Sequence, residues 1–386
     1  MTAKTIHGKS PSELKISLKE CIDNIFFPSL AILFISVRQE INSIIEILSA
    51  HNIDVIGATS CSEFVEGNQT DGGYAIMLLE ISSTDYCLLF EEVGNSTLAE
   101  ASRRISQSAL LKFSKPAFIV LSTSINRLGE MLDGETIVRN IVDETETKTN
   151  FFGGMAGDDF TFKGTSVFTN NQNTDKGIAA LVIDETRIEM YGVALSGWKA
   201  IGVSKTITKC DGNLLFEIDG QPALEMYLRF LGPDFTTLED RMKFFDSLGL
   251  HYPLQVERKG SEPMMCNPIG YNSTEGALML ESVVEQGSKF RFSTPPDFDI
   301  VETVVNKAKQ IKSHVNTDAD ALLIFSCASR LSALGPMAEQ ENNELALVWN
   351  CPMAGFYTYG EFGRAVDGKH EFHSTTCSWV VLKAKE

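Results

Sequence analysis

One structural unit is predicted three times along this chain of 386 residues. Each copy starts with an apolar strand that ends in a small polar residue, at residues 30–36, 117–122 and 321–326. A helix, a second strand and a glycine turn that leads to an acid then follow, which is the strand–helix–strand order of α/β proteins. This order is too common to establish a duplication, but it predicts where the loops gather.

The helices and second strands of the units are assigned from the spacing of apolar residues. Helices are predicted around residues 41–48 and 134–142, where apolar residues recur three and four positions apart. The second strands with their glycine turns are predicted at residues 55–63 and 151–159. In the third copy we expect a strand at residues 345–349 and a turn at residues 354–361.

Alternating apolar and polar residues between these units predict further, antiparallel strands. They lie at residues 164–168, 177–183, 188–195, 277–280 and 289–292. The fold class is therefore predicted to be α/β, with two closely packed domains whose mixed, substantially antiparallel sheets are flanked by helices. Turn clusters at residues 211–213 and 219–222 place the domain boundary, giving domains 1–220 and 221–386.

The charge balance excludes some classes of partner. Lys and Arg total 33 against 51 Asp and Glu, a formal charge of -18 that repels nucleic acid and anionic lipid surfaces. The first residues have no apolar segment typical of a secretory signal, and the longest apolar run, residues 25–37, is interrupted by Pro28 and Ser29. We expect a cytoplasmic protein without membrane insertion.

The glycine-rich segment at residues 151–159 contains Gly154 and ends in Asp158 and Asp159. Its backbone suits a phosphate, but the two acids repel an anion and the Lys-Ser/Thr ending of a P-loop is missing. The segment therefore favours an ammonium group or a metal ion. The alternative is a tight turn in which an Asp caps the next segment.

The end of the strand at residues 321–326 is followed by Cys327 and Arg330, where open α/β sheets commonly bind ligands. Arg330 is suited to hold a carboxylate with two hydrogen bonds. The alternative is an ion pair at the surface of the strand end. Both interpretations remain open at this point.

The turn at residues 354–361 contains Tyr357, Tyr359 and Glu361. The two tyrosines share a face if the segment is extended, and Glu361 is suited to accept a hydrogen bond from an amine. The alternative is that both tyrosines are half-buried packing residues.

Two histidines and two cysteines define further hypotheses. His370 and His373 are three apart and lie on opposite faces of a regular strand, so they form a poor chelating pair. His373 is a candidate axial ligand of haem, against a structural role in hydrogen bonding. Eight cysteines without a Cys-x-x-Cys pair indicate reduced thiols, and Cys61 or Cys327 is a candidate nucleophile of a thiol-dependent enzyme.

The chain resembles the FIST family from about residue 30 to residue 383. In the first half the resemblance depends on the segments Ile-Gly-Ala-Thr-Ser at residues 56–60 and Gly-Gly-Met-Ala-Gly-Asp at residues 153–158, and on residues 197–202 and 219–223. In the second half it depends on residues 325–330, 355–361 and 373–376. The chain departs from the family pattern at Ser374, where an asparagine commonly follows the histidine.

The resemblance implies an intracellular signal-transduction sensor that binds a small, amino-acid-like ligand and is not an enzyme. It also implies a partner protein, such as a histidine kinase or a cyclic-dinucleotide enzyme. Some members of the family resemble haem proteins that sense nitric oxide and regulate a histidine kinase. Haem is therefore a candidate cofactor, and a haem-based sensor is the alternative function.

The predicted ligand site combines the glycine turns of both halves. Acids that accept an ammonium and an arginine that holds a carboxylate suit a zwitterion. The predicted ligand-binding residues are Thr59, Ser60, Gly154, Asp158, Cys327, Arg330, Tyr357, Tyr359, Glu361 and Thr375, with His373 as the axial ligand if haem is bound.

Overall fold

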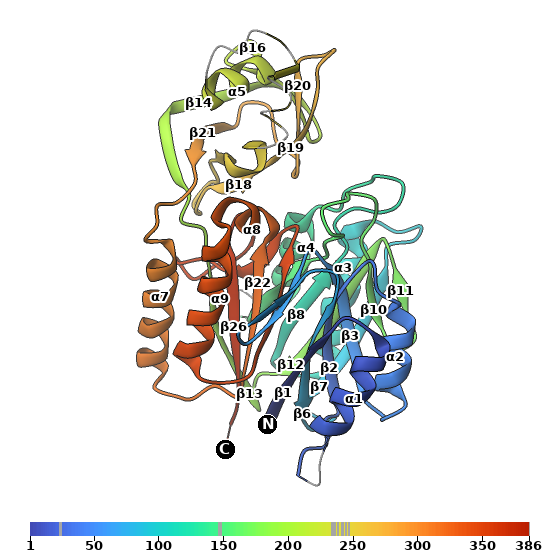
Figure 1. The fold of residues 1–386 in the computed structure, drawn as a ribbon. Coiled ribbons are helices and arrows are strands. Elements are labelled where there is room, and N and C mark those ends of the chain that lie inside the picture. Colours follow the sequence, from blue (N-terminus) through green and yellow to red (C-terminus); the bar gives the residue numbers. More distant parts are fainter. Residues whose placement is uncertain are drawn as a thin grey trace.

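The computed structural model describes residues 1–22, 25–145, 149–232, 237, 239–240, 243, 245 and 248–385. These residues form a body of three mixed sheets and a smaller lobe of antiparallel strands that stands at one end of the body (Figure 1). Both termini lie at the opposite end. The predicted α/β class with substantial antiparallel pairing is confirmed.

Each sheet of the body has six strands within the described residues. The first sheet has the order β1 (Thr2–Gly8), β6 (Tyr74–Glu80), β2 (Leu30–Ser36), β3 (Asp54–Ser60), β10 (Val167–Thr169), β11 (Asn173–Thr174). The second has the order β25 (His370–His373), β24 (Glu361–Arg364), β9 (Phe151–Met155), β8 (Pro116–Ser122), β12 (Gly177–Asp184), β7 (Tyr86–Glu92). The third has the order β13 (Ile188–Leu195), β26 (Cys377–Ala384), β22 (Ala321–Cys327), β23 (Met353–Thr358), β4 (Glu63–Val65), β5 (Asn68–Thr70).

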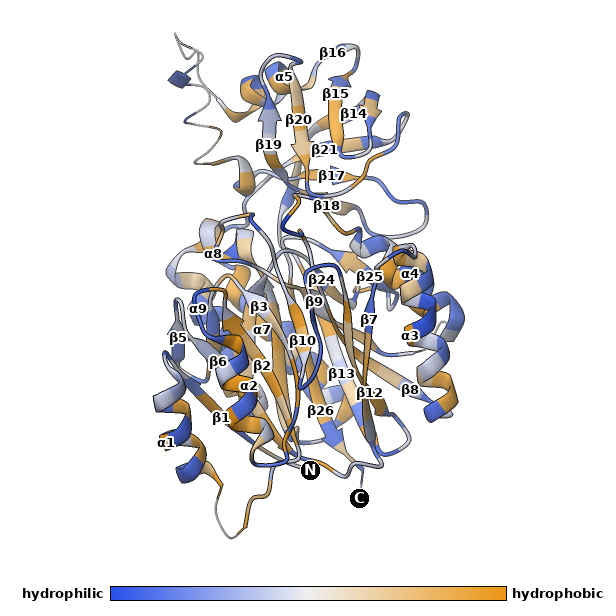
Figure 2. Ribbon diagram, turned by 90° about the vertical axis from the view of Figure 1, so that its right-hand side faces the viewer, coloured by the Kyte–Doolittle hydropathy of each residue, from blue (hydrophilic) through white to orange (hydrophobic). Residues whose placement is uncertain are grey.

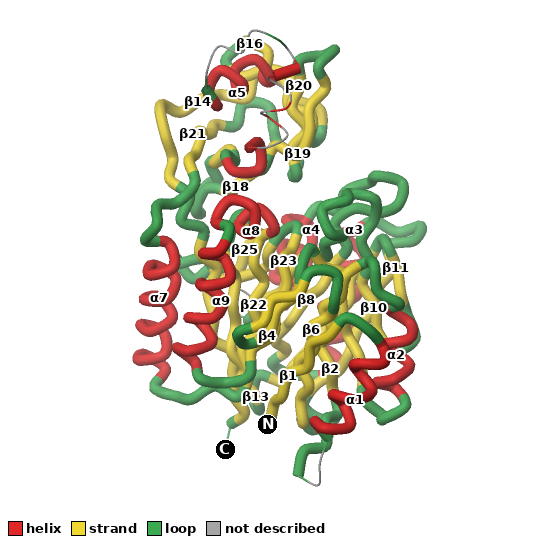
Figure 3. Tube along the Cα trace, viewed as in Figure 1, coloured by secondary structure: helices red, strands yellow, loops and turns green. Residues whose placement is uncertain are grey.

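The predicted strand–helix–strand units supply the central parallel pair of each sheet, β2 with β3, β8 with β9, and β22 with β23. Helices cover the outer faces of the sheets (Figure 3). The first sheet packs against α1 (Pro11–Cys21) and α2 (Ile41–Ser49), and the second against α3 (Leu98–Lys112) and α4 (Gly134–Thr145). The third packs against α7 (Ile300–Val315), α8 (Ala328–Leu334) and α9 (Pro336–Trp349).

One hydrophobic core lies between the inner faces of all three sheets. Phe34 of β2, Leu121 of β8 and Phe325 of β22 point into it, and the Phe34 and Phe356 rings stack at 4.5 Å. Neighbouring residues such as Leu33 point outward to the helices. Because both faces are buried, these strands are continuously apolar, and in Figure 2 the strands of the body are mostly orange.

The three units are joined by exchanging strands. The strand that follows β3, β4, pairs with β23, whereas the strand that follows β23, β24, pairs with β9. The strand that follows β9, β10, returns to pair with β3. The second and third sheets therefore contain strands from both sides of the predicted boundary between residues 220 and 221.

Two predictions about the units are wrong. Residues 345–349, expected as a strand, form the end of α9, because a short apolar run looks alike in a strand and in a buried helix. The glycines expected in turns, Gly57, Gly153 and Gly355, lie inside β3, β9 and β23. Their function is therefore to permit close packing within a sheet.

A phenylalanine of the exchanged strand lies opposite each of these glycines. Phe168 pairs with Gly57, Phe64 with Gly355 and Phe362 with Gly153. A Cβ atom would lie 2.3 Å from the Phe168 ring if placed on Gly57, and 2.4 Å from the Phe64 ring if placed on Gly355. On Gly153, whose φ is 142°, it would lie 1.8 Å from the carbonyl oxygen of Val120. Only glycine fits these positions.

The lobe has its own core and one antiparallel sheet of eight strands within the described residues. Its strands are β14 (Lys199–Asp211), β15 (Leu214–Ile218), β16 (Gln221–Pro222), β17 (Leu254–Val256), β18 (Met264–Cys266), β19 (Pro268–Asn272), β20 (Ala277–Leu280) and β21 (Lys289–Thr294). It also contains α5 (Ala223–Leu231) and the short helix η1 (Gly249–His251). Residues 196–198 and 295–299 connect it to the body.

Among the helices of the described residues, none combines the length and the apolar character that crossing a bilayer requires.

Two glutamates follow the second strands and are buried with hydroxyl partners. The Ser60 hydroxyl donates to Glu63, and the Thr358 hydroxyl donates to Glu361. Burial raises the pKa of each of these two carboxyl groups to about 8. Both acids are therefore protonated in the folded protein at neutral pH.

We expect Gly153→Ala to lower the free energy of unfolding by more than about 3 kcal/mol, since overpacking and an unfavourable φ both contribute. Denaturant unfolding at equilibrium measures this change. Gly94→Ala is the matched control, because Gly94 also has a positive φ, of 52°, but no atom within 4 Å of the added Cβ. Equal losses in the two variants would show that close packing at Gly153 is not the cause.

We expect the stability of the wild type to fall as pH rises from 6.5 to 8. In this window the unfolded chain has released the Glu361 proton and the folded chain still holds it, so the unfolded state binds fewer protons. His370 and His373 oppose this trend in the lower part of the window, because burial lowers the pKa of these imidazoles to about 4 and about 3 while the unfolded imidazoles still carry part of their protons. Their contribution is the same in wild type and in a Glu361 variant, so it cancels in the comparison below.

Glu361→Gln is expected to reduce this slope by up to about 1.4 kcal/mol per pH unit. The measurement is urea unfolding at several pH values. Glu40→Gln, at an exposed position, serves as the control and is expected to keep the wild-type slope. A wild-type slope in Glu361→Gln would mean that Glu361 is already ionised in the folded protein.

Candidate functional site

The three predicted motifs meet at one end of the body. The Cys61 N–H donates to the Tyr357 carbonyl oxygen at 3.0 Å, and the Tyr359 N–H donates to that of Met155 at 3.1 Å. The Gly157 N–H closes the ring by donating to the Thr59 carbonyl oxygen at 2.9 Å. The ends of β3, β9 and β23 are thus held together by a cycle of backbone hydrogen bonds.

A cavity of about 50 Å³ lies next to this ring, between the body and the lobe. Cys327, Thr358 and Tyr359 line it from the body, and Asn267 and Ile269 line it from the lobe. One water needs roughly 10–15 Å³ of such space, so the cavity has room for several waters or for a small ligand. We call it the junction cavity.

Tyr359 forms an aromatic wall of the junction cavity. Its ring stacks on Phe162 with centroids 4.8 Å apart and planes 5° apart, and Phe160 approaches edge-on at 6.5 Å. Its hydroxyl donates to Asp158 Oδ1 at 2.6 Å. Tyr357 does not line this cavity. It lies inside β23, which ends at Thr358, and its hydroxyl contacts Gln69 and Asn342.

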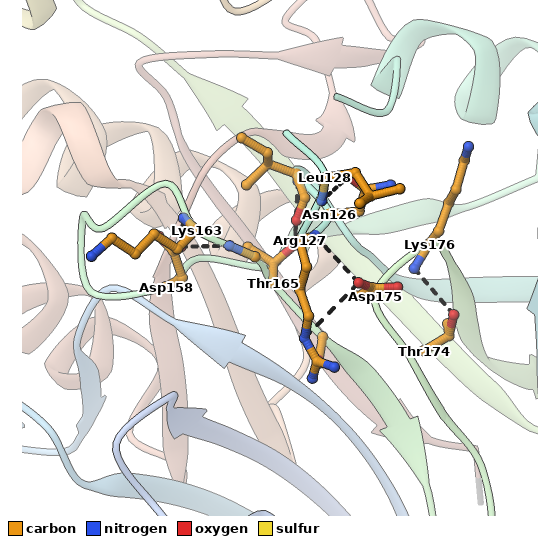
Figure 4. Close-up of polar contacts among 12 residues, drawn as sticks. Asn126, Arg127, Leu128, Asp158, Lys163, Thr165, Thr174, Asp175 and Lys176 are labelled. Carbon is orange, nitrogen blue, oxygen red and sulfur yellow. Dashed lines mark hydrogen bonds and ion pairs between the residues drawn. The ribbon is translucent and has the colours of Figure 1, made fainter. Parts of the chain in front are cut away.

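Asp158 organises the loop that carries these aromatic residues. Its carboxylate accepts hydrogen bonds from the Thr161 hydroxyl and from the backbone N–H groups of Phe162, Lys163 and Gly164, at 2.6–3.0 Å. Figure 4 shows Asp158 beside Lys163, next to the segment that carries Arg127. The carboxylate is completely buried, and its hydrogen-bonding capacity is used inside the protein.

The loop held by Asp158 is strained. Asp159, Phe160 and Phe162 have φ values of 54°, 60° and 51°, a region that residues other than glycine rarely adopt. Each such residue costs roughly 1–3 kcal/mol and persists only where its surroundings enforce it. Ser36 and Arg38 bind the Asp159 carboxylate, at 2.7 and 3.1 Å, and so hold the first residue of the loop.

Arg330 is buried behind the junction cavity and does not line it. Its guanidinium pairs with Glu341 of α9 and donates to the carbonyl oxygens of Ser196 and Thr375, at 2.5 and 3.2 Å. It also lies over the Trp198 ring at 5.7 Å. Its charge is therefore balanced within the protein, and it tethers α8 to α9 and to the connection with the lobe.

The remaining predicted residues do not line the cavity and bind other groups of the protein. Glu361 accepts from Thr358 and from the backbone and hydroxyl of Thr376. Thr59 bonds the Ser166 backbone, and Gly154 pairs with Glu361 across the sheet. The Ser60 hydroxyl binds Glu63, and the hydroxyl of Thr375 contacts that of Ser196. Among the predicted ligand-binding residues, Cys327 and Tyr359 line the cavity.

The lobe contributes a polar pair that the sequence did not reveal. The Asn267 side-chain amide donates to both oxygens of Glu281 at 3.1 and 3.0 Å, and to the Ser374 hydroxyl of the body at 2.8 Å. Burial raises the pKa of Glu281 to about 7. An isolated Asn after a short strand carries no recognisable signal, because its role depends on how the lobe meets the body.

The two candidate nucleophiles are buried thiols. Burial raises the pKa of Cys61 to about 12 and that of Cys327 well above its usual range, so both are protonated at neutral pH. The Ser329 hydroxyl donates to Cys327 at 3.0 Å. This environment is the opposite of the one that activates a cysteine, and it gives the enzyme hypothesis no support.

The two histidines occupy different environments on β25. His370 Nδ1 lies 3.0 Å from the Phe151 carbonyl oxygen. His373 borders a second cavity, of about 390 Å³, which Trp198, Met264 and Met265 also line. Its Nε2 lies 3.4 Å from the Gly363 carbonyl oxygen. Within the described ranges, no group of three His, Cys, Asp or Glu side chains is arranged to bind a metal ion.

The chain is similar to curated proteins of mycobacteria. Uncharacterized proteins of Mycobacterium bovis and Mycobacterium tuberculosis are each 25% identical to it over 203 residues, 49% of this chain and 50% of each relative. Another uncharacterized protein of Mycobacterium tuberculosis is 23% identical over 274 residues, 67% of this chain and 63% of that protein. The chain thus spans about half the length of the first of these relatives.

Family models match most of the sequence. The FIST N domain matches residues 29–221, and the FIST C domain matches residues 223–364. The boundary between the two matches lies inside the lobe, between β16 and α5. Because the two matches cover more than half of the chain, the chain belongs to the FIST family, whose domains are sensory modules of signal transduction that bind small ligands.

Proposed function

We propose that this protein encloses a small ligand in the junction cavity and signals its presence to a partner protein. The observation that supports the proposal most strongly is that the walls of this cavity come from both the body and the lobe. A ligand that contacts both parts stabilises one position of the lobe relative to the other positions. Ligand occupancy is thereby converted into a change of shape.

The contacts between lobe and body suit such a mechanism. Arg258 of the lobe donates to Glu371, to Glu135 and to the carbonyl oxygen of Phe372, at 3.0, 2.9 and 2.8 Å. These contacts are polar and specific, and a movement of the lobe about its short connections would exchange them for others. The proposed partner is a histidine kinase or a cyclic-dinucleotide enzyme, as the family resemblance implies.

The predicted zwitterion site needs revision in this proposal. Asp158 and Arg330 are already bound to groups of the protein, and Glu361 is buried and protonated. We therefore assign direct ligand contact to Cys327 and Tyr359 and a supporting role to the other predicted residues. Amino acids remain the ligand class that the family resemblance implies.

We expect Ile269→Trp to abolish ligand binding, because the larger side chain fills the cavity from the lobe side. The assay screens the common amino acids and small metabolites by thermal shift and confirms each hit by calorimetry. Leu347→Trp, on the exposed face of α9, makes the same kind of change outside the cavity and is expected to bind normally. A hit that binds Ile269→Trp as tightly as wild type would place the site elsewhere.

A haem-based sensor is the second candidate, and the position of His373 favours it. The imidazole borders a cavity of about 390 Å³, and its lowered pKa keeps it neutral, the form that ligates a metal. Among the described residues its Nε2 has one weak contact, at 3.4 Å, so this nitrogen would be the one to hold a haem iron. When bound, haem supplies an iron that takes a diatomic gas.

For this candidate we expect a Soret band after reconstitution of the purified protein with haemin. His373→Ala is expected to lose or shift the band, whereas His370→Ala, which changes the neighbouring imidazole, is expected to keep it. Absence of a Soret band in wild type would exclude haem, and an unchanged spectrum in His373→Ala would exclude this histidine as the ligand.

A further inference from the structure

The walls of the junction cavity are mainly apolar and aromatic. Phe160 and Phe162 of the strained loop line it together with Ile125, Ile269 and Phe372. A ligand gains most of its affinity here by burying apolar surface, and flat rings pack well against Tyr359 and Phe162.

Among the described residues that line the cavity, Glu281 is the acid and no Lys, Arg or His is present. Glu281 is the ionisable acid of the lining, and the backbone and side-chain N–H groups of Asn267 bind its carboxyl group. The Asp158 carboxylate behind Tyr359 is bound by the loop that it organises. Burying a zwitterion here leaves its carboxylate without a counter-charge, because the described lining contains an acid and no cation, and this is unfavourable.

Among the described residues that line the cavity, Asn267 has a side-chain oxygen without a hydrogen-bond partner. Asn267 is 1% exposed, its N–H groups all donate, and its Oδ1 accepts no hydrogen bond from the described residues. The hydroxyls of Ser124, Ser329, Thr358 and Tyr359 all have partners within the protein.

The orientation of the Asn267 amide is set by its neighbours. Its NH₂ group faces the two Glu281 oxygens and the Ser374 hydroxyl. Rotating the amide by half a turn would place its oxygen against those carboxyl oxygens, which is unfavourable when Glu281 is ionised. The acceptor is therefore left for a group that comes from outside the chain.

We infer that the junction cavity is built for a small, uncharged, largely apolar molecule, such as an aromatic alcohol, that donates one hydrogen bond to Oδ1 of Asn267. This inference rests on the proposed function and names the chemical class of its ligand. Asn267 then determines specificity, because an apolar ligand without a donor leaves its buried oxygen unpaired. Asn267 belongs to the lobe and also bonds Ser374 of the body. A ligand bound to its Oδ1 therefore affects the contact between the lobe and the body.

The test compares phenol with anisole and toluene as probes of the full-length protein by calorimetry. Phenol is expected to bind at least about tenfold more tightly than anisole, which keeps the oxygen and loses the donor; one good hydrogen bond accounts for such a ratio. Anisole is the more apolar of the two, so burial of surface alone predicts the reverse order. Equal or tighter binding of anisole would overturn the inference.

Asn267→Leu provides the matched variant, because leucine has nearly the shape of asparagine without its polar atoms. It is expected to lose at least about tenfold in phenol affinity and to bind toluene as well as wild type or better. The anisole comparison needs wild type alone and remains decisive if this variant does not fold.

The outcomes also separate this inference from the proposed function. If no probe binds but an amino acid or metabolite binds wild type and not Ile269→Trp, the sensor cavity stands and the ligand class named here is wrong. If phenol binds Ile269→Trp as well as wild type, the probe lies outside the cavity and the inference also fails.

Discussion

The structure depends on the pairing of each exchanged strand with the glycine-containing strand of another unit. Phe168, Phe64 and Phe362 lie opposite Gly57, Gly355 and Gly153, so each sheet is completed by a strand from another unit. Because no unit completes its own sheet, none has a full set of strand partners alone. The common core is made of residues from all three units, so burying its apolar surface requires strands from each of them.

This exchange also creates the functional end of the body. Strands that cross from unit to unit bring the ends of β3, β9 and β23 together, where the ring of backbone hydrogen bonds joins them. The acids near these ends then serve the structure: Glu63 and Glu361 bind nearby hydroxyls, and Asp158 holds a strained loop. The aromatic residues of that loop are left facing the lobe.

The sequence was sufficient for features that depend on local pattern. The apolar runs of β2, β8 and β22, with both faces buried, predicted the three units and their α/β class. The sequence was insufficient where the role of a residue depends on a partner that is distant along the chain. The sequence around Gly57 and Gly355 is typical of turns, but in the structure an aromatic ring packs against each glycine. Arg330 was predicted to bind a ligand, but in the structure it pairs with Glu341. The role of Asn267 depends on where the lobe meets the body, which the local sequence does not indicate.

The distribution of charge at the junction has a consequence for sensing. Among the described residues that line the junction cavity, Glu281 is bound by Asn267, so in the proposed sensor a ligand would meet mainly apolar walls, hydroxyls already in use and the unpartnered amide oxygen of Asn267. Selectivity in such a site comes from shape and from the penalty of leaving that oxygen unpaired, rather than from attraction between charges. The contacts of Arg258 with Glu135 and Glu371 and the short connections at residues 196–198 and 295–299 join the lobe to the body. A ligand that moved the lobe would have to compensate for the loss of these contacts by binding the new position more tightly.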